Sequence, residues 1–289
     1  MRWRGRRGSA NIEDRRGRRG GGKAAVGGIG GFGLIAVLLI GWFFGIDVTP
    51  FLSGGGGGFQ TSAPAGESRP LSEAERQEGQ FVSVVLADTE EVWAEIFREQ
   101  VGQPYDPATL VLFSQVTQSP CGGASGATGP FYCPADEKAY LDTAFFTTLE
   151  RQLGARGDFA AAYVVAHEIA HHVQNELGIL SQANAIRAQS STEQSNAISV
   201  RIELQADCYS GIWARYAQAR FGAIEPGDLE EAVNAAREIG DDTLQREAGR
   251  VPRPHTFTHG TSEQRARWFM TGYQTGDMTA CDTFSADRL

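Results

Sequence analysis

One stretch of the chain must form a buried helix that nevertheless carries three ionisable side chains. Its apolar positions recur at helical rather than alternating spacing, with alanines between many of them. They are Phe159, Val164, Val165, Ile169, Val173 and Leu177. Gly178 follows and can end the helix. His167, Glu168 and His171 lie within this run, so the buried helix has to accommodate two imidazoles and a carboxylate.

The two histidines are placed to share one metal ion. They are four residues apart, and residues i and i+4 lie on the same helix face. Without a metal, these polar groups would be costly to bury. Zinc suits such a pair, and in H-E-x-x-H sites the glutamate is the general base rather than a ligand. The pattern predicts zinc-assisted hydrolysis, most often of peptides. His172 points about 100° away from His171, so we expect it to support the site from outside or simply to pack.

A third ligand is needed to close the site. The metzincin motif would require Gly and His where this chain has Gln174 and Leu177, which excludes that class. Glu203 and Asp207 share a face of a later segment of helical character. Glu203 can bind zinc while Asp207 accepts the Nδ1–H of a ligand histidine. Alone, the two acids would fit a solvated face better, but the first motif favours a role in the site.

At this point the sequence resembles known metallopeptidases. His167-Glu168-x-x-His171 followed by Glu203-x-x-x-Asp207 is similar to the pattern of the gluzincins. Three further segments resemble the neutral zinc metallopeptidases of bacteria: Met1–Arg7, Gly129–Pro134, and His259–Thr261 with Gln264 and Arg265. The resemblance runs from the first residues to near the C-terminus and is more specific for zinc than for substrate. It implies one zinc per chain held by His167, His171 and Glu203, with Glu168 as catalytic base and a peptide or protein as substrate.

A loop histidine could complete the catalytic groups. The oxyanion formed during peptide hydrolysis needs a donor besides zinc, and His259 or His255 could supply it. Either histidine could instead be a surface residue, a helix-capping neighbour, or the third ligand in place of Glu203. Thr261 is expected to cap the helix that follows.

Residues 1–46 have the composition of a membrane anchor. Residues 1–23 hold nine basic and two acidic side chains, and residues 24–46 hold no charge. A helix of that length rises about 35 Å, enough for a hydrocarbon core of about 30 Å. The rival interpretation is a cleaved signal peptide, but the run is long and ends in Trp42, Phe43 and Phe44. We therefore expect a single-pass protein of the bacterial cytoplasmic membrane, with residues 1–23 as a cytoplasmic arm and the remainder outside.

The remaining chain divides into a linker and one domain. Residues 47–72 are rich in Gly, Ser and Pro and predict a flexible tether. Residues 73–289 form the predicted zinc metallopeptidase domain, whose acidic balance makes nucleic acid an unsuitable partner. Its fold class is α+β, mostly helical with a small sheet and similar to the zincin fold. We expect a helix over 73–101, strands at 110–113 and 139–142, and mainly helices over 143–276. Residues 130–142 are the candidate edge strand for binding extended substrate.

The cysteines agree with export to an oxidising compartment. All four lie after the uncharged run, and none forms a C-x-x-C motif. Two disulfides are expected, and among three connectivities we favour Cys121–Cys133 with Cys208–Cys281. Four buried free thiols are the alternative.

Two other classes of function fit parts of the sequence. One is a non-catalytic zinc-binding or peptide-capturing envelope protein, although such a protein has no need of the base Glu168. The other is a structural envelope protein whose acidic domain is a docking module, which would not need stoichiometric zinc.

Overall fold

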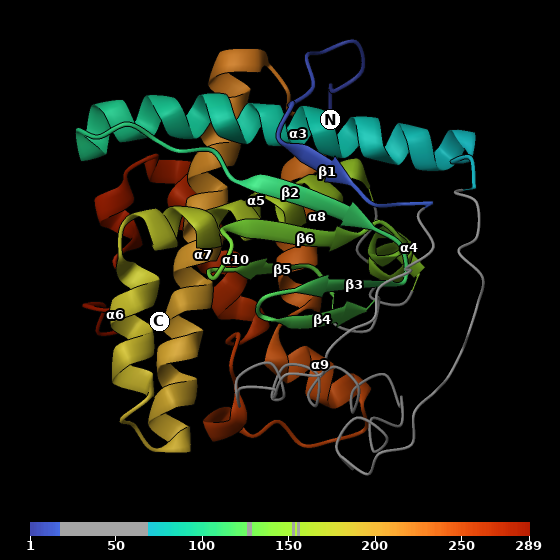
Figure 1. Ribbon diagram of the computed structural model, residues 1–289. Coiled ribbons are helices and arrows are strands. Elements are labelled where there is room, and N and C mark those ends of the chain that lie inside the picture. The colour runs from blue at the N-terminus through green and yellow to red at the C-terminus, as the bar shows by residue number, and fades with distance from the viewer. Residues whose placement is uncertain (18–68, 126–128, 152–153, 155–156) are drawn as a thin grey trace.

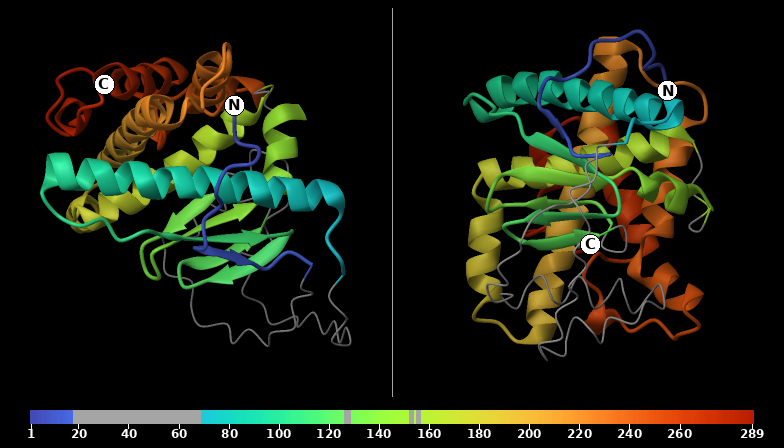
Figure 2. Two further views of the ribbon diagram at one scale, coloured as in Figure 1. Left: turned by 90° about the horizontal axis from the view of Figure 1, so that it is seen from above. Right: turned by 45° about the vertical axis from the view of Figure 1, so that its right-hand side comes forward.

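The structure is a computed structural model that describes residues 1–17, 69–125, 129–151, 154 and 157–289. Within these ranges the chain is mostly helical with a small sheet, which confirms the predicted α+β class. Figures 1 and 2 show four helices gathered on one side of the sheet. They are α5 (Asp158–Glu176), α7 (Thr192–Phe221), α8 (Asp228–Glu238) and α10 (Ser262–Thr275).

The main sheet has four strands, two of which were predicted. Their spatial order is β1 (Ile12–Asp14), β2 (Thr109–Phe113), β6 (Lys138–Asp142) and β5 (Phe131–Cys133). The first three are parallel, and β5 runs antiparallel to β6. The predictions at 110–113 and 139–142 are confirmed as β2 and β6. The edge-strand prediction over 130–142 holds only for β5, because β6 is paired on both sides.

Helix α3 (Glu73–Ile96) is the first element after the linker. Ser72 and Glu75 form a reciprocal capping box at its start, since each side chain accepts a hydrogen bond from the other residue's backbone N–H. A π-helical turn, η1 (Phe97–Val101), continues it to Gly102, whose φ of 76° ends the element. This confirms the helix predicted over 73–101.

Helices dominate the chain from residue 143 onward, as predicted. Besides the four named above, the described elements are α4 (Ala144–Arg151), α6 (Ile179–Arg187), α9 (Asp241–Glu247) and the 3-10 helices η2 (Pro254–Thr256) and η3 (Met278–Cys281). The hairpin β3 (Val116–Ser119) and β4 (Gly122–Ser125) lies outside the main sheet.

Helices α7 and α10 touch backbone to backbone through two glycines. A Cβ on Gly211 would lie 1.9 Å from the carbonyl oxygen of Phe269, and one on Gly272 would lie 1.8 Å from that of Cys208. No larger residue fits at either position without moving a helix. The contact sets the distance from α10 to the helix that carries Glu203 and Asp207.

Residues 1–17 of the predicted basic arm pack against the domain, and residues 18–23 lie outside the described residues. Strand β1 pairs in parallel with β2, opposing Glu13 to Val111. Arg6 donates to both carboxylate oxygens of Asp88, at 2.8 and 2.5 Å. Arg2 and Arg7 likewise have acidic partners within the domain, Glu225 and Glu91.

Gly17 and Arg69, which flank residues 18–68, also meet. The backbone N–H of Arg69 donates to the carbonyl of Gly17 at 3.2 Å. Strands that share hydrogen bonds cannot lie on opposite sides of a hydrocarbon core about 30 Å thick. The cytoplasmic location of residues 1–23 and the external location of the domain stay predictions. Among the described residues no helix is both long and apolar enough to cross a membrane. The predicted span 24–46 and most of the linker 47–72 lie outside the described residues.

Both disulfides have the connectivity that the sequence analysis favoured. Cys121 is bonded to Cys133 and joins the β3–β4 hairpin to β5. Cys208 is bonded to Cys281, 73 residues later, and joins α7 to the C-terminal tail. No cysteine in the described residues is free.

Candidate metal centre

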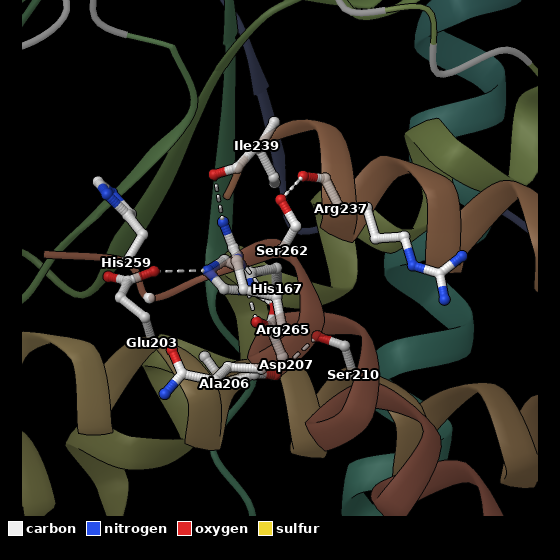
Figure 3. A network of polar contacts seen from close by, with 12 residues as sticks. His167, Glu203, Ala206, Asp207, Ser210, Arg237, Ile239, His259, Ser262 and Arg265 are labelled. Carbon is white, nitrogen blue, oxygen red and sulfur yellow. Dashed lines mark hydrogen bonds and ion pairs between the residues drawn. The ribbon is translucent and has the colours of Figure 1, made fainter. Parts of the chain in front are cut away.

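Two helices bring the three predicted ligands together. His167 and His171 lie one turn apart on α5. Glu203 faces His167 from α7 (Figure 3). The Nε2 atoms of His167 and His171 are 3.1 Å and 3.6 Å from the two carboxylate oxygens of Glu203. One ligand atom from each residue falls within 4.8 Å of the others. This is the spacing that a single small cation requires.

The histidines present Nε2 to the cluster because Nδ1 of each ring faces another group. Nδ1 of His167 is 3.0 Å from Asp207 Oδ1, although its N–H is not well aligned with that oxygen. Nδ1 of His171 is 2.9 Å from Oε1 of Gln174. Such partners fix the orientation of a metal-binding imidazole. The predicted role of Asp207 agrees with this placement.

Asp207 is fully buried between three partners. Arg265 on α10 donates from Nε to Oδ2 at 2.8 Å and from Nη2 to Oδ1 at 2.9 Å, and the Tyr163 hydroxyl donates to Oδ1 at 2.5 Å. Burial alone would raise the pKa of Asp207, but the charges of Arg265 and His167 hold it below its usual value. Asp207 therefore stays ionised behind His167.

Glu168 lies beside the cluster, and one of its carboxylate oxygens has no hydrogen-bond partner. The residue is 8% exposed, and its Oε2 atom has no hydrogen-bond partner. Burial raises the pKa of Glu168 to about 7, and the nearby charge of Glu203 acts in the same direction. A buried, unsatisfied carboxylate with a pKa near neutrality is suited to accept a proton from a bound molecule.

His259 is brought to the site, whereas His255 is not. One carboxylate oxygen of Asp241 accepts the backbone N–H groups of Thr258, His259 and Gly260 at 2.8, 2.6 and 3.0 Å. The other oxygen is 3.3 Å from Nδ1 of His259. Burial lowers the pKa of His259, but Asp241 and Glu203 raise it by more.

Figure 3 shows His259 next to Glu203. His255 lies exposed on η2 and is not part of the ligand group. Thr261 caps α10 as predicted, in a capping box with Gln264.

His172 supports the fold next to the site. Its Nδ1 is 3.0 Å from the Tyr132 hydroxyl on β5, and its Nε2 is 2.6 Å from the carbonyl of Asp106. Both ring nitrogens are therefore occupied away from the cluster. The contact ties the edge strand to helix α5.

The ligand group has the chemistry of a catalytic zinc site. Two imidazoles and one carboxylate form a donor set found in zinc hydrolases. Burial lowers the pKa of both histidines, but Asp207 and Glu203 raise that of His167 to about 9. In the metal-free site a proton therefore occupies His167 at neutral pH, where a cation would replace it. The unpartnered Oε2 of Glu168 is a second sign that another group belongs here.

Several residues of the site were not predicted. The sequence analysis treated Gln174 only as a mismatch to the metzincin motif. Its place three residues after His171, on the same helix face, could have identified it as a partner of that histidine. Arg265 and Asp241 reach the site through folding, across 58 and 18 residues of sequence from their main partners Asp207 and His259. Arg265 lies in a segment that resembles the family, but no local pattern assigns a role to either residue.

Comparison with known proteins gives a consistent result. The sequence model of the family described as "Putative neutral zinc metallopeptidase" matches residues 1–284. The uncharacterised protein YpfJ of Escherichia coli K12 is 43% identical over 291 residues, which covers 98% of this chain and 99% of that protein. The uncharacterised protein Rv2575 of Mycobacterium tuberculosis H37Rv is 47% identical over 195 residues, 64% of this chain and 65% of that protein. No solved structure matches the chain.

Proposed function

Since the chain belongs to the family of neutral zinc metallopeptidases, we propose that it hydrolyses peptide bonds with one zinc ion held by His167, His171 and Glu203. The observation that carries the proposal is the convergence of these three donors beside Glu168. Bound there, zinc would polarise a peptide carbonyl and lower the pKa of a water molecule to about 7. A protein that only captured zinc or peptides would have no use for a buried carboxylate at this place.

Glu168 is the general base of the proposed reaction. Its pKa of about 7 in the metal-free site lets it take a proton from the attacking water at neutral pH. The same carboxyl group then passes that proton to the amine that leaves when the C–N bond breaks. The proton is returned in the second step, so Glu168 ends the cycle ionised.

His259 is the proposed donor to the oxyanion. The Asp241 contacts hold its loop and occupy Nδ1, which leaves Nε2 for a substrate oxygen. The raised pKa of His259 favours the protonated ring, in which both nitrogens donate. A fixed donor of this kind stabilises negative charge as it develops.

The edge strand β5 is the proposed docking strand for substrate. It pairs with β6 on one side only, so its other side can add an extended peptide by backbone hydrogen bonds. Tyr132 on β5 contacts His172 of α5, which holds the strand next to the helix of the metal ligands. We further propose that the domain works in an oxidising compartment, because both cysteine pairs are disulfide-bonded.

Zinc analysis and peptide cleavage on the same purified chain test this function. We expect about one zinc per chain and hydrolysis that a chelator abolishes and added zinc restores. Glu168→Gln should keep zinc and lower kcat by about 10²- to 10⁴-fold, because the carboxylate is a base and not a ligand. Loss of zinc in this variant would contradict the role of Glu168, and a chain without stoichiometric zinc would contradict the function.

A further inference from the structure

A chain of side-chain amides leads from the ligand His171 to the C-terminal tail. Nδ1 of His171 donates to Oε1 of Gln174 at 2.9 Å. The Nε2 group of Gln174 donates to Gln205 Oε1 at 3.0 Å and to the carbonyl of Ile202 at 2.8 Å. Gln205 in turn donates to the carbonyl of Cys281 at 3.1 Å. Gln174 and Gln205 are 0% and 5% exposed, so water does not compete for these bonds.

The hydrogen bonds through these two amides can run in only one direction from donor to acceptor. If the Gln174 amide were reversed, its oxygen would face two other oxygens, those of Ile202 and Gln205, and its NH₂ group would face His171. A reversed Gln205 would likewise place its oxygen against the carbonyl of Cys281. Because a backbone carbonyl can only accept, Cys281 and Ile202 fix both amides with their oxygens toward α5.

This direction decides which nitrogen of His171 is free. An acceptor at Nδ1 requires the proton to be on Nδ1, which leaves the lone pair on Nε2 for a metal. With a donor at Nδ1, the neutral ring would carry its proton on Nε2 and could not bind a cation there. The carbonyl that ends the chain belongs to Cys281, whose disulfide to Cys208 attaches the tail to α7.

We propose that Gln174 and Gln205 are positioning residues that hold His171 in its metal-binding tautomer, and that the Cys208–Cys281 disulfide anchors them. The inference rests on the proposed zinc site and assigns this disulfide a part in metal affinity. The second disulfide, Cys121–Cys133, bonds the hairpin to β5 and takes no part in the chain of amides.

The test measures zinc affinity by competition with a chelator on the full chain. Gln174→Met keeps the size of the side chain and removes the acceptor, so we expect affinity to fall by about 10- to 100-fold. Gln205→Met should have a smaller effect, because Ile202 still holds the Gln174 amide. Asn175→Ala is the matched control, since this neighbour on α5 contacts Glu137 and Tyr132 and not the chain of amides, and it should bind zinc like the parent.

A spectroscopic readout is independent of how the variants fold. The chain has five histidines, and nitrogen NMR of the zinc-free parent should show His171 with its neutral-ring proton on Nδ1. A proton on Nε2 would overturn the proposal, as would parental zinc affinity in folded Gln174→Met. If the parent itself bound no zinc, the proposed function would fail instead.

The two disulfides provide the last comparison. Replacing Cys208 and Cys281 together by alanine should weaken zinc binding, by about 10-fold or less because the Ile202 carbonyl remains. Replacing Cys121 and Cys133 should leave zinc affinity unchanged. Equal affinities in the two double variants would overturn the link to Cys281.

Discussion

Arg265 on α10 holds both carboxylate oxygens of Asp207 on α7, with Nε 2.8 Å from Oδ2 and Nη2 2.9 Å from Oδ1. Its Nη2 also donates to the hydroxyl of Tyr163 on α5, at 3.2 Å. The contact therefore joins three helices directly behind the ligand His167. The backbone contact of α10 with α7 at Gly272 and Gly211 brings Arg265 within this reach.

Loss of this arginine should affect both stability and metal binding. Arg265→Met leaves the Asp207 carboxylate buried without its main partner, and breaking a buried ion pair in this way costs about 3–5 kcal/mol. Zinc affinity should fall as well, because Asp207 orients His167. Chemical unfolding and zinc competition measure the two effects. Arg265→Lys should recover only part of each, since lysine cannot bind both oxygens in the same geometry.

Arg267 is the control for that experiment. It lies on the same helix, is about one-third exposed, and pairs at 3.9 Å with Glu263, which is 84% exposed. Arg267→Met should change the free energy of unfolding by less than about 1 kcal/mol. Equal losses in the two methionine variants would show that the Asp207 contact is not special.

Zinc binding should release a proton at neutral pH. In the metal-free site Asp207 and Glu203 raise the pKa of His167 to about 9 against the opposing effect of burial. Below that pH the ring is protonated, and zinc must displace the proton from Nε2. The logarithm of the zinc affinity should therefore rise by about one per pH unit toward pH 9.

The measurement is best made on Glu168→Gln, because Glu168 has its own pKa of about 7 and would add a second proton. Calorimetry in buffers of different protonation enthalpy counts the protons directly. A zinc affinity independent of pH over the neutral range would mean that His167 is already neutral before metal binds.

The part of the site that lies on one helix could be predicted from sequence, because local spacing and burial act together there. His167, Glu168 and His171 lie in an apolar run of helical period. Burying these polar groups without a bound metal would cost free energy, which indicates a metal site. The shared helix face of Glu203 and Asp207 indicated a role in the site only in combination with that motif. Arg265 and Asp241 could not be found in this way, since only packing brings them to their partners.

The N-terminal residues show the opposite case, because their composition did not predict that residues 1–17 pack against the domain. Many arginines in a short stretch normally indicate a solvated segment. Here Arg6 binds buried Asp88, and Arg16 is itself buried and paired with Asp14. The acidic partner Asp88 lies 82 residues away in sequence. A count of charges cannot show which charges are paired.

His259 should contribute to the rate and not to zinc retention. His259→Ala removes the proposed oxyanion donor, so kcat should fall by about 10²- to 10³-fold while zinc occupancy stays complete. His255→Ala is the control, because that histidine is exposed and lies in the same loop. Peptide hydrolysis and metal analysis on both variants decide the matter. Zinc loss in His259→Ala would instead make His259 a ligand.

The last prediction concerns the side of the membrane on which residues 1–17 and the domain from residue 69 onward lie. Since β1 pairs with β2, residues 1–17 and the domain from residue 69 onward should be accessible from the same side. Arg4 and Val251 are exposed, Val251 by 81%, and all four native cysteines are in disulfides. Arg4→Cys and Val251→Cys thus each introduce a single reactive thiol.

Labelling of intact spheroplasts with a membrane-impermeant maleimide should treat the two variants alike. Both should react, because we propose from the two disulfides that the domain works in an oxidising compartment. Lysed spheroplasts serve as the control that each thiol can be labelled at all. If only Val251→Cys reacted before lysis, residues 1–23 would be the cytoplasmic arm that their charge suggested, and β1 could not pair with β2 in the cell. Reaction of neither would place the whole folded unit inside, where the two disulfides would have to persist against the reducing poise of the cytoplasm.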